Sequence, residues 1–356
     1  MSLADLNRRT QPAQRFRVFN RTKVIPRAWF FAFRSSEVPV GQVVPLRIGD
    51  QRLVVFRGND GKPAVLDAFC PHMGTDLALG RVVGDSIQCH FHHWRFSTDG
   101  LCVEIPCQKS IPETARTRSY ACCERYGAIW VFPDSVSDFP MFEIPGLEGK
   151  LTESDFDQSN WSASPYHVSM VNGLDAQHLR TVHGMGIDMK VSINEGEGVI
   201  DFVLEGPVPS ASLSGRLTKF FLGPSYSYAM RYVGASIAAL VLLRGVHFLR
   251  PTWVWPELYM IFAYRPLPDG GSMTQPIFVA ERRPGVLGWL RGLMLRRAVR
   301  VAYHFLEEDD QRIYDNIRFQ AKNMLSIDSA VARYVRFVEA LTPSDWSSEG
   351  ADGEPR

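Results

Sequence analysis

Two cysteines and two histidines between residues 70 and 92 constrain this chain more than any other feature of its 356 residues. The segment 70–94 reads CPHMGTDLALGRVVGDSIQCHFHHW, in which Cys70-x-His72 is followed, sixteen residues later, by Cys89-x-x-His92. Each half of the motif supplies one thiolate and one imidazole. All six cysteines lie between residues 70 and 123, and this distribution favours reduced thiols or metal ligands over a disulfide scaffold.

Two kinds of metal centre use such ligands. Zinc fingers usually take a cysteine pair from one end of the motif and a histidine pair from the other. One cysteine and one histidine at each end instead favour a [2Fe–2S] cluster of the Rieske type, with two thiolates on one iron and two imidazoles on the second. We therefore predict that Cys70 and Cys89 bind one iron and that His72 and His92 bind the other.

Other cysteines and histidines near the motif are not needed as ligands, because a cluster of this type takes four. We expect His90 and His93 to be structural or to lie behind the ligands. The remaining thiols are expected to be small buried residues of the same domain; they are Cys102, Cys107, Cys122 and Cys123.

The residues around the motif have the pattern of short strands and turns. The apolar segments 52–57 and 63–69 flank Asn59-Asp60-Gly61, which predicts a hairpin. A second turn is predicted at Thr98-Asp99-Gly100, and AIWVF at 128–132 is a further strand. We predict an N-terminal segment over residues 1–26 and an all-β domain over residues 27–134.

The rest of the chain mixes helical and strand patterns. Helices are predicted at 166–183 and in stretches from about 286 to 341, with strands near 199–204 and 226–233 and between 237 and 264. We assign residues 135–342 to a second domain. The polar tail 343–356 is predicted to be disordered.

A second group of metal ligands is predicted in VNGLDAQHLRTVH, residues 171–183. Two imidazoles on one segment and a distant carboxylate make the 2-His-1-carboxylate triad of non-haem Fe(II), and His178 and His183 fit it. Positions five apart on an ideal helix are about 140° apart, so the helix must bulge or end between the two histidines. Gly184 predicts such an end.

The carboxylate of this triad is sought in HFLEEDDQRIYDNIRFQ, residues 304–320. Leu306, Asp310, Ile313 and Ile317 form one stripe at helical spacing, and an acid within an apolar stripe needs a partner. We predict Asp310 as the ligand, with Asp309 as the alternative.

Together these motifs resemble the oxygenase α subunit of the Rieske non-haem iron oxygenases, from about Trp29 to Glu339. Within that family the chain is most similar to the ketosteroid hydroxylases, in the CxHMGxDL pattern at 70–77 and in the D-x-x-I-aromatic pattern from Asp310 to Tyr314. The resemblance implies an α+β fold, in which an N-terminal all-β Rieske domain precedes a catalytic domain with a helix over an antiparallel sheet. It also implies a homotrimer.

The resemblance further implies a monooxygenase that hydroxylates a bulky apolar substrate, sterol-like or terpenoid, with O2 at a mononuclear Fe(II). A separate NAD(P)H-dependent reductase, with or without a ferredoxin, would supply the electrons. Asp175 is expected to hydrogen-bond the outer ring nitrogen of His178 and to pass electrons from His92 of a neighbouring subunit. The alternatives are demethylation, desaturation, aromatic dihydroxylation, or a Rieske electron carrier without enzymatic activity.

Charge and hydropathy indicate which kinds of partner and which cellular location to expect for this protein. The net charge of +1 gives no basic surface for nucleic acid. Neither a signal peptide nor an apolar segment long enough to span a bilayer is recognisable, so we expect a cytoplasmic protein. The apolar, arginine-containing segment 284–305 raises a peripheral membrane contact as a further hypothesis.

Overall fold

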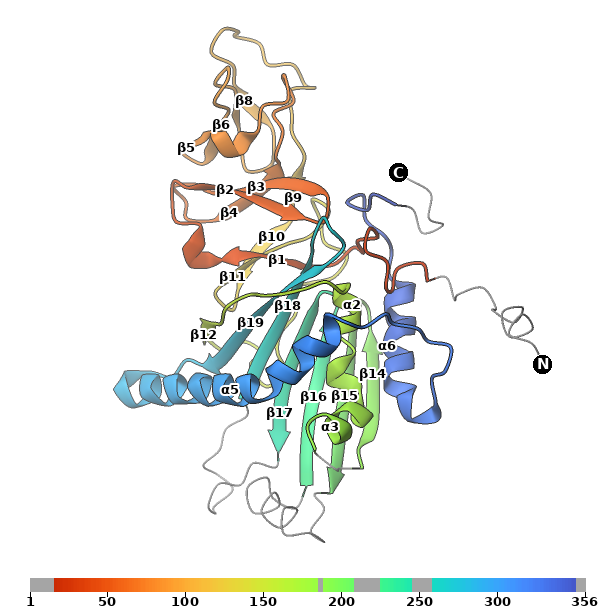
Figure 1. Ribbon diagram of the computed structural model, residues 1–356. Helices are drawn as coiled ribbons and strands as arrows, with labels where there is room; N and C mark the ends of the chain where they lie inside the picture. The colour runs from red at the N-terminus through yellow and green to blue at the C-terminus, as the bar shows by residue number, and fades with distance from the viewer. Residues whose placement is uncertain (1–15, 185–187, 208–224, 245–257, 350–356) are drawn as a thin grey trace, which may run out of the picture.

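The chain folds into an upper β-rich part and a lower part built on one large sheet (Figure 1). The computed structural model describes residues 16–184, 188–207, 225–244 and 258–349. The upper part contains three antiparallel sheets, ordered β1-β11-β10, β2-β3-β4-β9 and β5-β6-β7-β8. Their strands are β1 (Phe30–Arg34), β2 (Val43–Ile48), β3 (Gln51–Arg57), β4 (Pro63–Asp67), β5 (Arg81–Val83), β6 (Ser86–Gln88), β7 (Arg95–Phe96), β8 (Cys102–Glu104), β9 (Ser119–Tyr120), β10 (Cys122–Arg125) and β11 (Ala128–Val131).

Both predicted turns of this part join paired strands. β3 and β4 form a hairpin with Leu53 opposite Asp67, and Gly61 between them has a φ of 77°. β7 and β8 pair on either side of Thr98-Asp99-Gly100, where Gly100 has a φ of 81°. Backbone of this left-handed kind favours glycine, so the hairpin predictions are confirmed.

The lower part is an eight-stranded sheet in the order β12-β19-β18-β17-β16-β15-β14, with β13 also paired to β19. All of its pairs are antiparallel. The strands are β12 (Thr152–Phe156), β13 (Asn160–Ser162), β14 (Lys190–Gly196), β15 (Val199–Pro207), β16 (Ser225–Val233), β17 (Ile237–Arg244), β18 (Leu258–Pro266) and β19 (Ser272–Glu281). The predicted α+β class, with helices over an antiparallel sheet, is confirmed.

Strand β19 was not predicted, because Pro276 interrupts its pattern. A proline cannot donate to a ladder and is tolerated where no partner needs its N–H. The carbonyl of Pro276 accepts from the Asp157 amide, which lies between β12 and β13. The missing N–H therefore faces the gap between those two strands, where the ladder is already interrupted.

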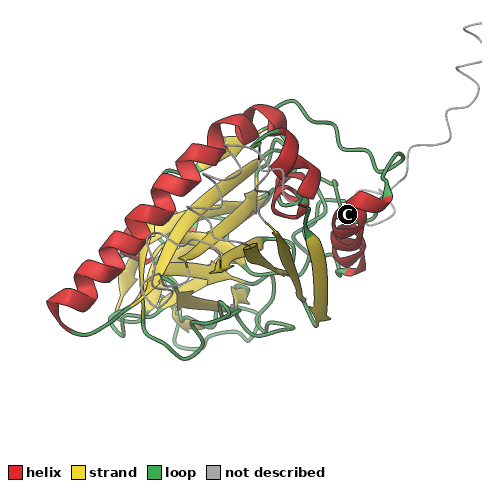
Figure 2. Ribbon diagram, turned by 90° about the horizontal axis from the view of Figure 1, so that it is seen from below, coloured by secondary structure: helices red, strands yellow, loops and turns green. Residues whose placement is uncertain are grey.

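Helices cover one face of the sheet. The long helix α5 (Gly285–Tyr314) contacts β18, β19 and β12, and α6 (Ser329–Ala340) contacts β15. Figure 2 shows the long helix lying across the strands. The stretch predicted as helical up to residue 341 is thus two helices with a break. Because α5 ends at Tyr314, Ile317 lies beyond the helix and is not part of the predicted stripe.

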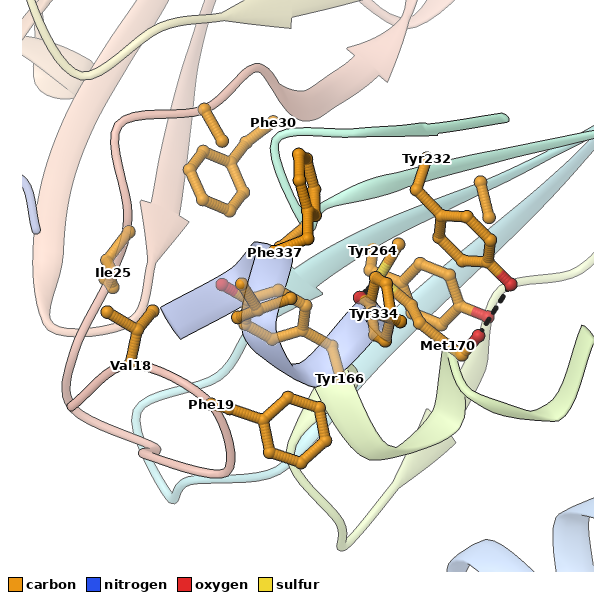
Figure 3. Packing of buried hydrophobic residues seen from close by; sticks show 14 of the residues in the cluster. Val18, Phe19, Ile25, Phe30, Tyr166, Met170, Tyr232, Tyr264, Tyr334 and Phe337 are labelled. Carbon is orange, nitrogen blue, oxygen red and sulfur yellow. Dashed lines mark hydrogen bonds between the residues drawn. The ribbon is translucent and has the colours of Figure 1, made fainter. Parts of the chain in front are cut away.

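The predicted helix at 166–183 is divided into three short pieces, which are α2 (Tyr166–Ser169), the 3-10 helix η4 (Asn172–Leu174) and α3 (Ala176–Thr181). Buried tyrosines hold the first piece in place. Tyr232 Oη donates to the Met170 carbonyl at 2.8 Å, and Tyr334 Oη approaches Met170 Sδ at 3.3 Å (Figure 3). Sheet and α6 together therefore fix the segment that leads to α3.

The end of the chain corrects one sequence prediction. Residues 343–356 were expected to be disordered, but Trp346 is only 3% exposed. Its ring packs on Phe30 and Tyr120, at centroid distances of 6.2 and 5.1 Å. Ser347 Oγ also accepts from the Ile25 amide at 3.0 Å. The prediction of disorder rested on the polar composition of the segment, which contains one large aromatic residue, Trp346. Burial of this side chain attaches residues 343–349 to the upper part. Residues 350–356 lie outside the described part.

Candidate metal centres

The first candidate centre is built from two loops of equal size at the tip of the upper part. The Cys70 amide donates to the Thr75 carbonyl at 2.9 Å, and the Cys89 amide donates to the Trp94 carbonyl at 2.8 Å. Each cysteine thus opens a loop that closes five residues later. The loops follow β4 and β6 and carry the two histidines of the motif between them.

Burial separates the four predicted ligands into two pairs. Cys70 and Cys89 are 3% and 2% exposed, whereas His72 and His92 are exposed and their ring centroids lie 4.6 Å apart. The ring of His72 stacks on Trp94 at 4.4 Å, which restricts its rotation. Two neighbouring thiols below two neighbouring imidazoles fit a cluster with sulfur ligands on one iron and nitrogen ligands on the other.

The protonation chemistry of Cys70 agrees with this fit. Burial, with a further contribution from Cys89, raises the pKa of Cys70 to about 11. A thiol in this environment is protonated at neutral pH unless a cation replaces the proton, and bound metal deprotonates thiols outright. Two free thiolates are therefore disfavoured here, and the cysteines are either protonated or bound to a cationic group.

The remaining histidines and cysteines of this part differ in burial. His90 and His93 are exposed, and His93 has a φ of 60°, which only a few non-glycine residues adopt. Cys102 is buried, as expected for a packing residue, but Cys107 is exposed. The expectation of burial is therefore wrong for Cys107.

The second candidate centre begins at the end of α3. His178 lies in the helix, the helix ends at Thr181, and Gly184 has a φ of 67°. This end turns His183 back, so that its Nε2 lies 2.9 Å from Nε2 of His178. The two rings are nearly perpendicular, with an interplanar angle of 78°. The helix therefore ends between the two histidines, as their spacing required.

Helix α5 brings the third group from more than one hundred residues away. Asp310 Oδ1 lies 2.9 Å from His178 Nε2 and 3.2 Å from His183 Nε2. These three ligand atoms lie within 4.8 Å of one another. The side chain of Asp309, the alternative ligand, lies outside the described part.

The spacing of these atoms fits a bound metal ion. Ligand atoms about 2.1 Å from a metal and about 90° apart are separated by about 3 Å, as on one face of an octahedron. Although Asp310 Oδ1 is close to both imidazoles, it is buried and has no hydrogen-bond donor in suitable geometry within the described residues. One bound cation would satisfy all three converging atoms, and the donor set is that of non-haem Fe(II).

Asn172 holds the carboxylate in this orientation. Its Nδ2 donates to Asp310 Oδ2 at 2.6 Å, which leaves Oδ1 directed at the histidines. Such contacts behind a ligand fix its orientation and its basicity. The sequence reasoning missed Asn172, although it lies in the segment 171–183 that was singled out.

Asp175 does not make the expected contact with the ring of His178. Its Oδ1 accepts from the amides of Gln177 and His178, at 2.9 and 3.1 Å, and so caps the N-terminus of α3. Among the hydrogen bonds of the described residues, none joins its carboxylate to the imidazole. Aspartate is a favoured N-cap residue because it satisfies free amides of the first turn, and this local role explains the observed orientation.

A cavity of about 270 Å³ opens next to the second centre, and His178, His183 and Asp310 are part of its wall. The opposite walls come mainly from the large sheet and α5 and are apolar. Their side chains are those of Met230, Leu240, Leu258, Met260, Phe262 and Val299. A mainly apolar cavity with polar groups at its wall is typical of a site for a small molecule.

Comparison with known proteins agrees with both centres. Residues 28–120 match the family model of the Rieske [2Fe–2S] domain. The chain is 48% identical over 251 residues to a probable 3-ketosteroid-9-alpha-monooxygenase, oxygenase component, of Rhodococcus rhodochrous, which covers 66% of this chain and 59% of that protein. It is 34% identical over 165 residues to cholesterol 7-desaturase of Bombyx mori, covering 46% of this chain and 36% of the desaturase.

The fold is also that of a solved oxygenase. The crystal structure of dicamba monooxygenase bound to dicamba superimposes with a TM-score of 0.66 and 19% sequence identity, covering 89% of this chain and 97% of that one. The chain carries a Rieske [2Fe–2S] domain and is similar in sequence to the oxygenase component named above. It spans less than half the length of the Bombyx mori desaturase and 59% of the Rhodococcus relative.

Rieske oxygenases combine a [2Fe–2S] cluster with a mononuclear non-haem iron, and the two ligand groups of this chain fit these two cofactors. In Figure 1, β6 lies near the top of the molecule and α3 lies in its lower half, beside the large sheet. Within one chain the cluster and the second centre are therefore far apart.

Proposed function

We propose that this protein is a Rieske monooxygenase that hydroxylates a bulky apolar substrate, sterol-like or terpenoid, in the cavity beside α3. The convergence of His178, His183 and Asp310 at the wall of an apolar cavity carries this proposal. When bound, iron at these ligands activates dioxygen, while the cluster supplies electrons one at a time. The overall reaction consumes the substrate C–H, O2, two electrons and two protons, and it gives the C–OH product and one water.

The side chains of the protein have three tasks in this reaction. Cys70, Cys89, His72 and His92 would hold the cluster, with the histidines at the surface, where electrons leave. His178 in α3, His183 just beyond it and Asp310 would hold the iron at the wall of the cavity, where it would supply the activation of dioxygen. The apolar walls would orient the substrate and keep water away from the reacting carbon.

Electrons must enter from outside the chain. We propose a separate NAD(P)H-dependent reductase, directly or through a ferredoxin, as the donor. We further propose a homotrimer in which the cluster of one subunit lies against α3 of its neighbour. The distance between the two centres within one chain supports this arrangement.

The relatives leave a second reaction open. One of them is named a cholesterol 7-desaturase and another a ketosteroid monooxygenase, so desaturation of the same substrate class is the main alternative to hydroxylation. Demethylation and aromatic dihydroxylation use the same cofactors. The product distinguishes hydroxylation from desaturation. A hydroxylated product carries one oxygen atom from O2, whereas a desaturated product carries none.

One set of measurements tests the proposal. The purified protein is examined by visible and low-temperature electron spin resonance spectroscopy, and its iron is counted. O2 uptake is then followed with cholesterol and with a 3-ketosteroid, with NAD(P)H and an added reductase as the source of electrons. We expect the Rieske signal, about three irons per chain and steroid-dependent O2 uptake. A carrier without enzymatic activity would bind only the two cluster irons and consume no O2 with substrate, and a zinc protein would be colourless.

A peripheral membrane contact is a further part of the proposal. None of the helices in the described ranges is long and apolar enough to cross a membrane. The first turns of α5 nevertheless expose Val286 and Leu287 by 78% and 83%, beside Trp289. Arg282 and Arg283 are exposed next to this apolar surface, and anionic lipid would complement their charge.

Two arginines inside α5 are instead engaged with β12. Arg296 is buried and pairs with Glu153 at 2.7 Å, and Arg300 donates to the Phe156 carbonyl. The test is co-sedimentation with vesicles of anionic phospholipid, with Trp289→Ala as the test variant and Trp161→Ala, at an exposed tryptophan elsewhere, as the control. Salt-sensitive binding that only Trp289→Ala weakens supports the contact, and no binding at low salt removes it.

A further inference from the structure

Two hydroxyl groups in the cavity have no hydrogen-bond partner within the described residues. Ser169 is 7% exposed and its Oγ is buried without a partner. Tyr314 Oη is also buried without a partner, and both residues line the cavity. Buried hydroxyls are nearly always hydrogen-bonded, so these two, on residues that line the same cavity, leave donors that a ligand reaching them would satisfy.

Several other polar groups of the cavity wall are already engaged. Asn160 Nδ2 donates to Tyr303 Oη at 2.7 Å, and Gln311 Nε2 donates to the Trp161 carbonyl at 2.9 Å. Asn172 is committed to Asp310. Ser169 and Tyr314 therefore differ from these neighbours, because their hydroxyl groups have no hydrogen-bond partner among the described residues.

The positions of the two hydroxyls place them near the metal ligands. Tyr314 is the last residue of α5, one helical turn beyond Asp310. Ser169 is the last residue of α2, three residues before Asn172, which holds the carboxylate of Asp310. A ligand atom bound by these hydroxyls would lie at the metal end of the cavity.

The chemistry of the wall selects an uncharged ligand. Burial raises the pKa of Tyr314 well above its usual value, so this phenol stays protonated and donates a hydrogen bond. A serine hydroxyl can donate or accept. In the described part of the cavity wall no lysine or arginine occurs, so the side chains supply no counter-charge for a carboxylate or phosphate on the substrate.

We infer that the substrate carries an uncharged oxygen function, a ketone or a hydroxyl, that is hydrogen-bonded by Tyr314 and Ser169 at the metal end of the cavity. This inference rests on the proposed function for the identity of the site and adds a polar anchor to the apolar substrate class. The anchor would determine which substrate carbons approach the metal. Tyr314 and Ser169 are positioning residues in this reaction.

The test uses the iron-loaded protein and three bicyclic probes that differ only in the anchor: decalin, 2-decalone and 2-decalol. Their binding is measured by ligand-observed NMR titration, which requires no turnover. We expect the ketone and the alcohol to bind about tenfold more tightly than the hydrocarbon. Tyr314→Phe and Ser169→Ala should each weaken binding of the oxygenated probes roughly 3- to 10-fold and leave decalin unchanged.

Tyr303→Phe is the matched control, because it removes a hydroxyl on the same helix that is already bonded to Asn160. It should change the affinities of the three probes by the same factor. Two results would contradict the inferred hydrogen bonds from Tyr314 and Ser169 to the substrate. One is equal affinity of wild type for decalin and 2-decalone, and the other is an equal effect of Tyr314→Phe on the affinities of all three probes.

A second probe set separates this inference from the proposed sterol substrate. Cholestane, cholesterol and cholest-4-en-3-one share a skeleton and differ at one ring position. Selective binding of 2-decalone without binding of any of these steroids would contradict the sterol-like substrate and support the anchor. Equal binding of all three steroids, with equal binding of the bicyclic probes, would contradict the anchor alone.

Discussion

Asn172 and Asp310 are 138 residues apart in the sequence, and a hydrogen bond of 2.6 Å joins their side chains. This bond occupies one carboxylate oxygen and leaves the other directed at two imidazoles. It also joins the segment before α3 to the last turns of α5. The contact therefore connects the part of the chain that carries the two histidines to the helix that carries Asp310.

Replacing Asn172 by alanine should therefore weaken iron binding. Loss of such a contact behind a ligand typically reduces metal affinity about 10- to 100-fold. The measurement is iron per chain after dialysis against a graded chelator, with the cluster spectrum recorded in parallel. Asn160→Ala is the control, since Asn160 lines the same cavity but bonds to Tyr303. Equal iron retention in both variants would show that Asp310 needs no such support.

The two adjacent aspartates of α5 should behave differently. Asp310→Asn should lose the mononuclear iron and O2 uptake while the Rieske spectrum is unchanged, because an amide is a much poorer ligand than a carboxylate. Asp309→Asn changes the charge of the helix by the same amount and should retain iron. Loss of iron in Asp309→Asn with retention in Asp310→Asn would reverse the assignment.

Substitutions of Asp175 can separate its cap from its proposed role in electron transfer. Asparagine caps helices about as well as aspartate, whereas Asp→Ala at an N-cap costs about 1 kcal/mol. We expect Asp175→Asn to keep the stability and the iron of the wild type, and Asp175→Ala to lose about that amount of stability.

The electron-transfer role is tested on Asp175→Asn by rapid mixing. If the carboxylate connects the cluster of a neighbouring subunit to the iron, the reduced cluster should reoxidise much more slowly when substrate and O2 are added. Reoxidation at the wild-type rate would leave Asp175 with the capping role that its two backbone contacts already explain.

Trp346 should contribute strongly to stability although it lies in a polar C-terminal segment. Its side chain is almost fully buried between Phe30 and Tyr120, and Trp→Ala in a packed site costs about 3–5 kcal/mol. Urea denaturation of Trp346→Ala should show this loss. Trp161→Ala, at a tryptophan that is 59% exposed, should be near neutral, and similar midpoints for both variants would contradict the packing role.

The ion pair between Arg57 and Glu124 should make the upper part sensitive to acid. Arg57 is buried and donates to both carboxylate oxygens, at 2.9 and 2.8 Å. These bonds lower the pKa of Glu124 below its usual value of 4.5, so the unfolded chain binds the proton more readily. The stabilisation is complete above the unfolded pKa and is lost as pH falls through the lower folded pKa.

Comparison with Glu124→Gln isolates this effect. The free energy of unfolding of wild type should exceed that of the variant at pH 7, and the difference should shrink below about pH 4.5. Parallel curves of stability against pH for the two proteins would show that the ion pair contributes no acid sensitivity.

Local spacing determined much of what the sequence reveals about this protein. The Cys70/His72 and Cys89/His92 pairs lie on loops that neighbouring hairpins position, and turn residues such as Gly61 signal those hairpins. The break between His178 and His183 follows from helix geometry alone. These features depend on dihedral preferences and periodicity within a few residues, which a sequence displays directly.

Tertiary structure decided the features that depend on distant partners. The choice of Asp310 as the neighbour of the histidines depends on how α5 lies over the sheet, and the role of Asn172 depends on that same placement. Strand β19 forms despite Pro276 because the missing N–H faces a gap in the ladder. Trp346 is ordered because its ring packs against Phe30 and Tyr120. Such contacts are set by packing between elements far apart in the chain, so no local pattern records them.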